Sequence, residues 1–165
     1  MGVLTSVCQV PLGVLGVCKR TPRLLDFFIY SDTVQATELG MADGWTAPRC
    51  GFDKEWEDLA TILRQSGHRH AGSILEYGGT DLKYPGGDVY CRSWRKTKLK
   101  QIRTDLRGLT AAQLKTEALA VSDLTDWDGE AAHDMLDYYL QSFDELHAMI
   151  LATIDQGDAL IALSS

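Results

Sequence analysis

The last third of the chain has the clearest alternation of hydrophobic and polar positions. Between residues 130 and 155 the apolar side chains recur every three or four positions, which is the period of one helix face. They are Ala132, Leu136, Tyr139, Phe143, Leu146, Ile150 and Ile154. Asp128 is a suitable N-cap, and Gly157 suits the position just after the helix. The pattern predicts a long C-terminal amphipathic helix of about seven turns, followed by a short buried strand at residues 159–163.

Three more helices are predicted in the middle of the chain. The first begins at Asp53 and ends at Gly67, with apolar residues at helical spacing and acids in its first turns. The other two are consecutive. One covers residues 93–107, and the next covers residues 110–120. The second of this pair begins with Thr-Ala-Ala-Gln, a capping box in which the outer two residues bind each other's backbone.

Strands account for less of the pattern. Runs of β-branched and small residues predict strands at residues 3–10 and 89–91. After the first of these, Pro11, Gly13 and Gly16 disfavour regular structure, so irregular chain is expected there. Together with the terminal strand, these elements predict a single α+β domain that covers all 165 residues and contains a small mixed sheet.

The composition is that of an ordinary globular protein with an acidic balance. The chain is 45% hydrophobic and 24% charged, and 16 basic against 23 acidic side chains give a net charge of −7. An acidic protein repels nucleic acids and anionic membranes as a whole, and it attracts basic partners. We therefore expect a basic protein as the partner, and neither a nucleic acid nor a membrane.

The cysteines and the N-terminal stretch favour a cytoplasmic protein. Cys8, Cys18, Cys50 and Cys91 contain no C-x-x-C pair, so a zinc site built on them is not expected. The uncharged N-terminal stretch lacks the basic residues and the uninterrupted apolar run of an export signal. The thiols are therefore expected to be reduced and packed in the core.

The predicted C-terminal helix carries acids opposite its apolar face. These candidate partner-binding residues are Glu130, Asp134, Asp137, Asp144 and Glu145. Like charges at this spacing repel one another, so a basic surface would compensate them. That surface is either a partner protein or a basic helix of the same chain. An ordinary solvated helix face is the third interpretation.

A basic stripe lies on the predicted helix at residues 93–107. Lys96, Lys100, Arg103 and Arg107 share one face of this helix. One interpretation is contact with phosphate groups, which the net negative charge argues against. The other is a solvated face that pairs with the acidic helix.

Searches for catalytic, cofactor and metal sites are negative. The G-x-S-x-G elbow, the P-loop and the dinucleotide-binding motif are absent. His133 and Asp137 offer two metal ligands on one helix face, but the sequence supplies no third. We therefore assign no catalytic, cofactor-binding or metal-binding residue and expect no cofactor.

Several segments together resemble one bacterial family. They are a Met1-Gly2 start before a strand, Asp53-Lys54-x-Trp56 before a helix, the paired helices Lys98–Leu109 and Thr110–Leu119 after Trp94, and a closing helix Glu130–Gln156 before Gly157. Their order and spacing resemble the YfbM-like family, a domain of unknown function. The resemblance implies an α+β fold in the bacterial cytoplasm, with a regular helix after the first strand. It supplies no function.

Three functional hypotheses follow from these observations, and the third is RNA or DNA binding through the basic stripe Lys96–Arg107. The first is a small acidic protein-binding module, most specifically an immunity protein that binds and neutralises a cognate bacterial toxin; small size, acidity and the lack of a catalytic motif motivate it. The alternative is a small hydrolase or transferase with a pocket under the glycine-rich loop 72–88. Its candidate site residues are Asp81, Asp88, His68 and His70. Such an enzyme requires a pocket in which polar groups converge.

Overall fold

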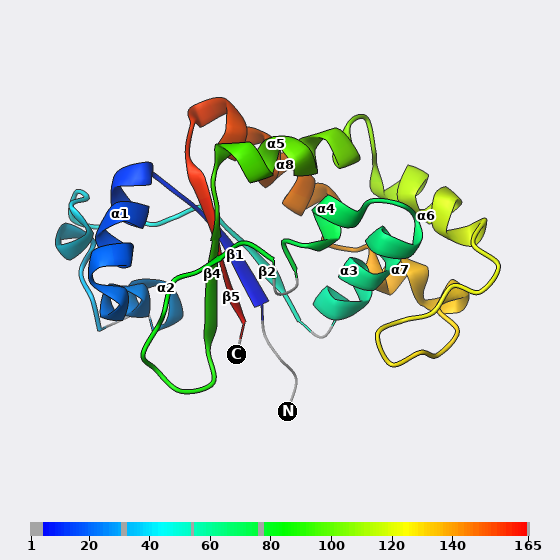
Figure 1. The fold of residues 1–165 in the computed structure, drawn as a ribbon, viewed down its shortest axis with the longest axis horizontal. Coiled ribbons are helices and arrows are strands. Elements are labelled where there is room, and N and C mark those ends of the chain that lie inside the picture. The colour runs from blue at the N-terminus through cyan, green and yellow to red at the C-terminus, as the bar shows by residue number, and fades with distance from the viewer. Residues whose placement is uncertain (1–4, 31–32, 54, 76–77, 165) are drawn as a thin grey trace.

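A five-stranded sheet forms the centre of the molecule (Figure 1). The computed structural model describes residues 5–30, 33–53, 55–75 and 78–164. The strands are β1 (Thr5–Val10), β2 (Arg49–Phe52), β3 (Thr80–Asp81), β4 (Tyr90–Trp94) and β5 (Ala159–Ser164), in the order β2-β1-β5-β4-β3. All neighbouring strands in this order are antiparallel, whereas a mixed sheet was expected. The α+β class is confirmed, and the predicted terminal strand lies in the middle of the sheet.

Helices cover both faces of this sheet (Figure 1). On one side lie α1 (Leu12–Arg20), the 3₁₀ helices η1 (Pro22–Leu25) and η2 (Ala36–Leu39), and α2 (Asp26–Ile29). On the other lie α3 (Glu55–Gln65), α4 (Arg69–Gly72), α5 (Lys96–Leu106), α6 (Ala111–Leu119), η3 (His133–Met135), α7 (Leu136–Tyr139) and α8 (Phe143–Gln156). Within the described residues, no helix has the length and apolar character needed to cross a membrane.

Alternation along β5 divides the apolar side chains between two cores. Leu160 and Ala162 belong to the core under α3–α8, whereas Ala159, Ile161 and Leu163 belong to the core under α1 and α2. All five side chains are buried. Successive side chains of a strand point to opposite faces, so a central strand covered on both sides reads as a continuous apolar run.

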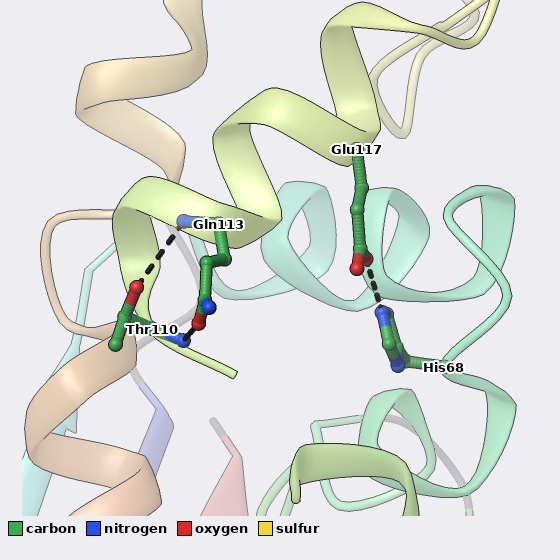
Figure 2. Close-up of polar contacts among 4 residues, drawn as sticks. All are labelled: His68, Thr110, Gln113 and Glu117. Carbon is green, nitrogen blue, oxygen red and sulfur yellow. Dashed lines mark hydrogen bonds and ion pairs between the residues drawn. The ribbon is translucent and has the colours of Figure 1, made fainter. Parts of the chain in front are cut away.

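The predicted pair of mid-chain helices is confirmed as α5 and α6. The N–H of Gln113 donates to Thr110 Oγ1 (3.2 Å), and the N–H of Thr110 donates to Gln113 Oε1 (2.8 Å), which completes the capping box (Figure 2). The helix α5 begins later than predicted, at Lys96, because Ser93 and Trp94 belong to β4.

The long C-terminal helix is present as α8, but it is shorter than predicted. The first half of the predicted span 130–155 forms η3 and α7, two short turns that are separate from α8. Gln141 and Ser142 lie in the break and donate to Glu55 Oε1 of α3 (3.1 and 3.5 Å). The break allows α7 to pack on α3 while α8 packs on α5 and the sheet. Gly157 ends α8 as predicted, with a φ of 71°.

Regular helix also occupies a segment that was expected to be irregular. The helix α1 begins directly after Pro11, whose φ of −56° and missing N–H suit the start of a helix. Val14, Leu15 and Cys18 are buried in the core under α1 and α2, so tertiary packing outweighs the low helix propensity of Gly13 and its neighbours. The helix that the family resemblance implied after the first strand is therefore present.

Candidate protein interface

The loop between α6 and η3 folds back on itself. The N–H of Asp126 donates to the carbonyl of Glu130 (2.9 Å), and the N–H of Glu130 donates to Asp126 Oδ1 (2.9 Å). Gly129 turns the chain with a φ of 86°, a conformation that favours glycine. The hydroxyl of Tyr139 on α7 donates to the other oxygen of Asp126 (3.1 Å). The turn thereby holds Trp127 at its tip.

Two side chains of α3 fasten this loop to the helix. Gln65 Nε2 donates to the carbonyl oxygen and to Oγ1 of Thr125 (3.0 and 3.1 Å), and Gln65 Oε1 accepts the N–H of Thr125 (3.0 Å). Asp58 Oδ1 accepts the N–H of Trp127 (3.0 Å). Because backbone groups of two loop residues are fixed in this way, the loop has a defined position before any partner binds.

Large apolar side chains are exposed beside the fastened loop. Trp127 is 46% exposed, Met135 is 46% exposed and Tyr138 is 39% exposed. Tyr138 lies three positions after Met135, and its ring centroid is 5.7 Å from that of Tyr139, which binds Asp126 of the loop. Aromatic side chains held in a fixed position are typical of the residues that contribute most to protein–protein binding.

Carboxylates lie near Trp127 and Tyr138. Glu57 and Asp58 lie on α3, and Asp126 and Asp128 lie in the loop. Burial raises the pKa of Asp58, and the charges of Asp126 and Asp128 raise it further, although the N–H of Trp127 lowers it. Burial and the charges of Asp58 and Asp128 also raise the pKa of Glu57. We call the following residues the acidic–aromatic surface: Glu57, Asp58, Asp126, Trp127, Asp128, Met135 and Tyr138.

Two of the five predicted contact residues have partners within the fold. Lys115 Nζ of α6 donates to Asp137 Oδ1 at 2.6 Å, which is an exposed ion pair. Asp144 Oδ1 accepts the N–H of Ala111 (2.9 Å) in the first turn of α6. Because the helix expected to carry these acids is interrupted, the five acids do not form one continuous row.

The other three predicted contact residues are exposed. Glu130 belongs to the loop of the acidic–aromatic surface, and Asp134 directly precedes Met135. Glu145 lies on α8. Burial, and next the charge of Glu145, raise the pKa of the Cys50 thiol on β2 to about 12. The structure therefore brings two of the predicted acids to the acidic–aromatic surface and leaves Glu145 near the sheet.

Sequence reasoning does not find the aromatic part of this surface. One signal is available, because Asp128-Gly129 is a typical turn dipeptide and Trp127 directly precedes it. A tryptophan in such a turn is poorly placed to reach the core. Tyr138 gives no comparable signal, because its neighbour Tyr139 has the same side chain and only the helical register decides which of the two is buried.

Two residues of the enzyme alternative, His68 and Asp81, have separate side-chain partners. His68 Nε2 lies 2.5 Å from Glu117 Oε2 of α6 (Figure 2), and Lys83 Nζ donates to Asp81 Oδ2 (2.7 Å). Leu82, in the glycine-rich loop, is buried in the core under α1 and α2. The described contacts therefore do not join these polar side chains into one site.

The thiols and the histidines show no arrangement for nucleophilic or metal chemistry. The four cysteines are free and buried, as expected: Cys8, Cys18, Cys50 and Cys91. Burial raises the pKa of Cys18 to about 11, so its reactive thiolate form is disfavoured at neutral pH. His133 Nε2 lies 3.0 Å from the carbonyl oxygen of Val121 rather than in a ligand pair with Asp137. Across residues 5–30, 33–53, 55–75 and 78–164 no three potential ligands form a metal-binding cluster.

Comparison with known proteins identifies the family. The family described as "Domain of unknown function (DUF1877)" matches residues 1–163, and the chain belongs to it. The fold is similar to that of YfbM from Escherichia coli, a protein of unknown function, with a TM-score of 0.60 and 11% sequence identity. This match covers 98% of this chain and 99% of YfbM. No curated protein matches the chain. The YfbM-like resemblance expected from the sequence is confirmed.

Proposed function

We propose that this member of the DUF1877 family is a protein-binding module whose acidic–aromatic surface binds a basic protein. The observation that carries the proposal is Trp127, which is 46% exposed on a loop fastened by Gln65 and Asp58. A side chain whose backbone is already ordered loses little conformational entropy when a partner covers it. The nearby carboxylates favour a basic partner by electrostatic complementarity.

We further propose that the partner is a bacterial toxin domain, which the chain neutralises in the cytoplasm as an immunity protein. A toxin that acts on nucleic acid requires a cationic surface for the phosphates. An acidic protein can cover such a surface and thereby block it. The net charge of −7 and the four carboxylates of the acidic–aromatic surface support a partner of this kind.

The predicted contact acids do not have equal weight in this proposal. Glu130 and Asp134 adjoin the acidic–aromatic surface and have no side-chain partner among the described residues, so their charges are available to a partner. Glu145 is also available, on α8. Asp137 and Asp144 already have partners within the fold. We therefore expect the charge reversal Asp134→Lys to weaken partner binding without removing a contact within the fold. Charge reversal at Asp137 or Asp144 would also remove an internal contact.

The experiment captures partners from the native bacterium with the tagged chain and two double variants, at low and at high salt. One variant, Trp127→Ala with Tyr138→Ala, removes the aromatic side chains of the acidic–aromatic surface. The matched control, Leu12→Ala with Leu119→Ala, removes two side chains of similar exposure on α1 and α6. We expect the first variant to bind the partner at least about thirtyfold more weakly, because a central aromatic contributes about 2 kcal/mol. The control should bind like the wild type.

The captured partner then tests the immunity proposal. Expressed alone, it should arrest growth, and coexpression of the wild-type chain should restore growth while the Trp127→Ala, Tyr138→Ala variant does not. A harmless partner that still requires Trp127 would support the binding module and contradict the immunity function. A partner that binds both double variants equally would contradict the acidic–aromatic surface itself.

A further inference from the structure

A basic groove lies between the C-terminal half of α5 and the middle of α8. It has a volume of about 670 Å³. Its lining includes Lys100, Arg103, Thr104, Arg107, His147 and Leu151, and no carboxylate of a described residue lines it. In Figure 1 the two helices lie together at the top of the molecule, whereas the yellow loop of the acidic–aromatic surface lies at the lower right. The two regions are therefore separate.

The three strong bases of this groove have no partner in the part of the chain that the structure describes. The side chains of Lys100, Arg103 and Arg107 form no ion pair or hydrogen bond with another described residue. The one acid of the same helix, Asp105, accepts the N–H groups of His70 (2.6 Å) and Ala71 of α4 (3.1 Å). The sequence-based interpretation that the basic stripe pairs with the acidic helix therefore gains no support.

Helical spacing explains why the bases gather beside α8. Lys100, Arg103 and Arg107 are separated by three and four positions, so they share one flank of α5. The interior face of the helix packs on α8. Basic side chains in the last turn complement the helix dipole, which accounts for part of the pattern. The dipole does not account for Lys100, which lies before the last turn. Nor does it account for the position of these bases beside His147 of α8 in the lining of one groove.

We propose that this basic groove binds a small molecule that carries a phosphate group. Guanidinium groups bind phosphate oxygens with two parallel hydrogen bonds, and Lys100 adds a point charge. The hydroxyl of Thr104 already donates to the carbonyl of Lys100 (3.0 Å), so the imidazole of His147 is the side chain that can donate a further hydrogen bond. Three positive charges around one hollow match a phosphate better than a singly charged carboxylate. The volume lies within the usual range for small-molecule sites, and Leu151 provides an apolar wall for an organic group.

A nucleic acid carries the same phosphate chemistry, but the molecule as a whole favours a small ligand. The net charge of −7 repels a long polyanion more strongly than it repels a short one. Single-stranded nucleic acids also require aromatic platforms on which successive bases stack. Among the described residues that line the groove, the imidazole of His147 is the one aromatic ring. A single hollow with three bases therefore fits one phosphate ester better than a nucleic-acid strand.

The test is a titration with inorganic pyrophosphate at low ionic strength, followed by calorimetry and by NMR chemical shifts. The groove variant is Arg103→Gln with Arg107→Gln. The control is Lys96→Gln with Lys98→Gln, which changes the net charge equally on the same helix but outside the groove. We expect saturable binding that shifts the resonances of Leu151 and His147. The groove variant should bind at least about tenfold more weakly, and the control within about twofold of the wild type.

Three outcomes would overturn the proposal. The first is the absence of saturable binding. The second is an equal loss of affinity in both variants, which would indicate only a general effect of charge. The third is tighter binding of a short single-stranded RNA than of pyrophosphate, with a steep salt dependence, which would assign the groove to nucleic acid. If the groove variant fails to fold, Arg103→Lys with Arg107→Lys keeps the charges and should still weaken binding, because it removes the planar guanidinium groups.

Discussion

The acidic–aromatic surface and the basic groove differ in how their charged groups are used. In the surface, Asp58 and Asp126 accept hydrogen bonds that fix the backbone of the loop. In the groove, the three basic side chains bind nothing within the described residues, and Asp105, the acid nearest to them in sequence, binds α4 instead. A charge with an internal partner positions other groups, so here the acids present Trp127. A set of like charges without an internal partner leaves its hydrogen-bonding capacity to a ligand.

This contrast also shows that the sign of a surface does not by itself identify its function. The acids of the surface repel one another, which contributes to the raised pKa of Asp58 and Glu57. A hydrogen bond from the backbone N–H of Trp127 stabilises the Asp58 carboxylate in this arrangement. We infer that affinity at this surface depends first on the position of Trp127 and second on charge. In the groove, we infer that affinity depends first on charge.

The variant with the largest expected effect removes the Gln65 side chain, which fastens the loop to α3. Gln65→Ala deletes three hydrogen bonds to Thr125. It should lower the free energy of unfolding by about 2 kcal/mol, because partly buried backbone groups lose their partners. Partner binding should weaken by about tenfold, since ordering a released loop costs about 1–2 kcal/mol per residue. Urea unfolding and calorimetric titration with the captured partner measure the two effects.

The control for this experiment is Gln113→Ala. Gln113 also bonds a backbone group through its side chain, but in the capping box of α6 (Figure 2). It should lower stability by about 1 kcal/mol and leave partner affinity unchanged. Equal losses of affinity in the Gln65 and Gln113 variants would mean that global stability, and not the position of the loop, governs binding. Pyrophosphate binding should be unaffected in both.

A smaller test separates the two roles of Asp58. Asp58→Asn keeps an acceptor for the N–H of Trp127 but removes the charge, whereas Asp58→Ala removes both. The alanine variant should be less stable than the asparagine variant by about 1 kcal/mol, the usual contribution of one hydrogen bond. The asparagine variant should exceed the wild type at neutral pH by at most about 0.5 kcal/mol, because solvent screens a partly exposed charge.

The sign of the pH dependence follows from the raised pKa of Asp58. Protonation of a carboxyl whose pKa is raised above 3.8 favours the folded state. This contribution to stability is complete below the ordinary pKa of the carboxyl, and it is lost as pH rises through the raised pKa of the folded state. The advantage of Asp58→Asn over the wild type should therefore shrink as pH falls towards 3.8. An advantage that grows on acidification would contradict the charge repulsion assigned to this residue.

Much of the fold follows from local patterns in the sequence. The capping box of α6, the glycine after α8 and the apolar run of β5 each require only the chemistry of a few neighbouring residues. The break before α8 is different. Apolar periodicity continues through residues 140–142, and the interruption depends on the position of Glu55 and on two packing surfaces that lie far away in sequence. The helix α1 likewise forms because the sheet buries one of its faces.

The candidate sites were less predictable than the fold. The basic residues of the groove were visible as a stripe, because one helix carries all three. The contribution of His147 required the packing of α8 on α5. The acidic–aromatic surface combines α3, the loop, η3 and α7, so no single periodic segment contains it. The predicted contact acids all lie in the C-terminal part of the chain, and the sequence does not reveal that Asp137 and Asp144 have partners within the fold.

The smallest test asks whether these internal partners stabilise the protein at all. Asp137→Ala removes the ion pair with Lys115, whereas Asp134→Ala removes an exposed acid without a partner among the described residues. The first change should lower the free energy of unfolding by about 0.5 kcal/mol at low salt, as exposed ion pairs do, and the second should leave it unchanged. High salt should remove the difference, because screening weakens the pair.

Partner affinity should show the reverse order, with the larger loss for Asp134→Ala. A larger loss of binding for Asp137→Ala would mean that an acid with a contact inside the fold also contacts the partner protein. That result would contradict the rule that charges with internal partners position other groups and charges without them bind ligands.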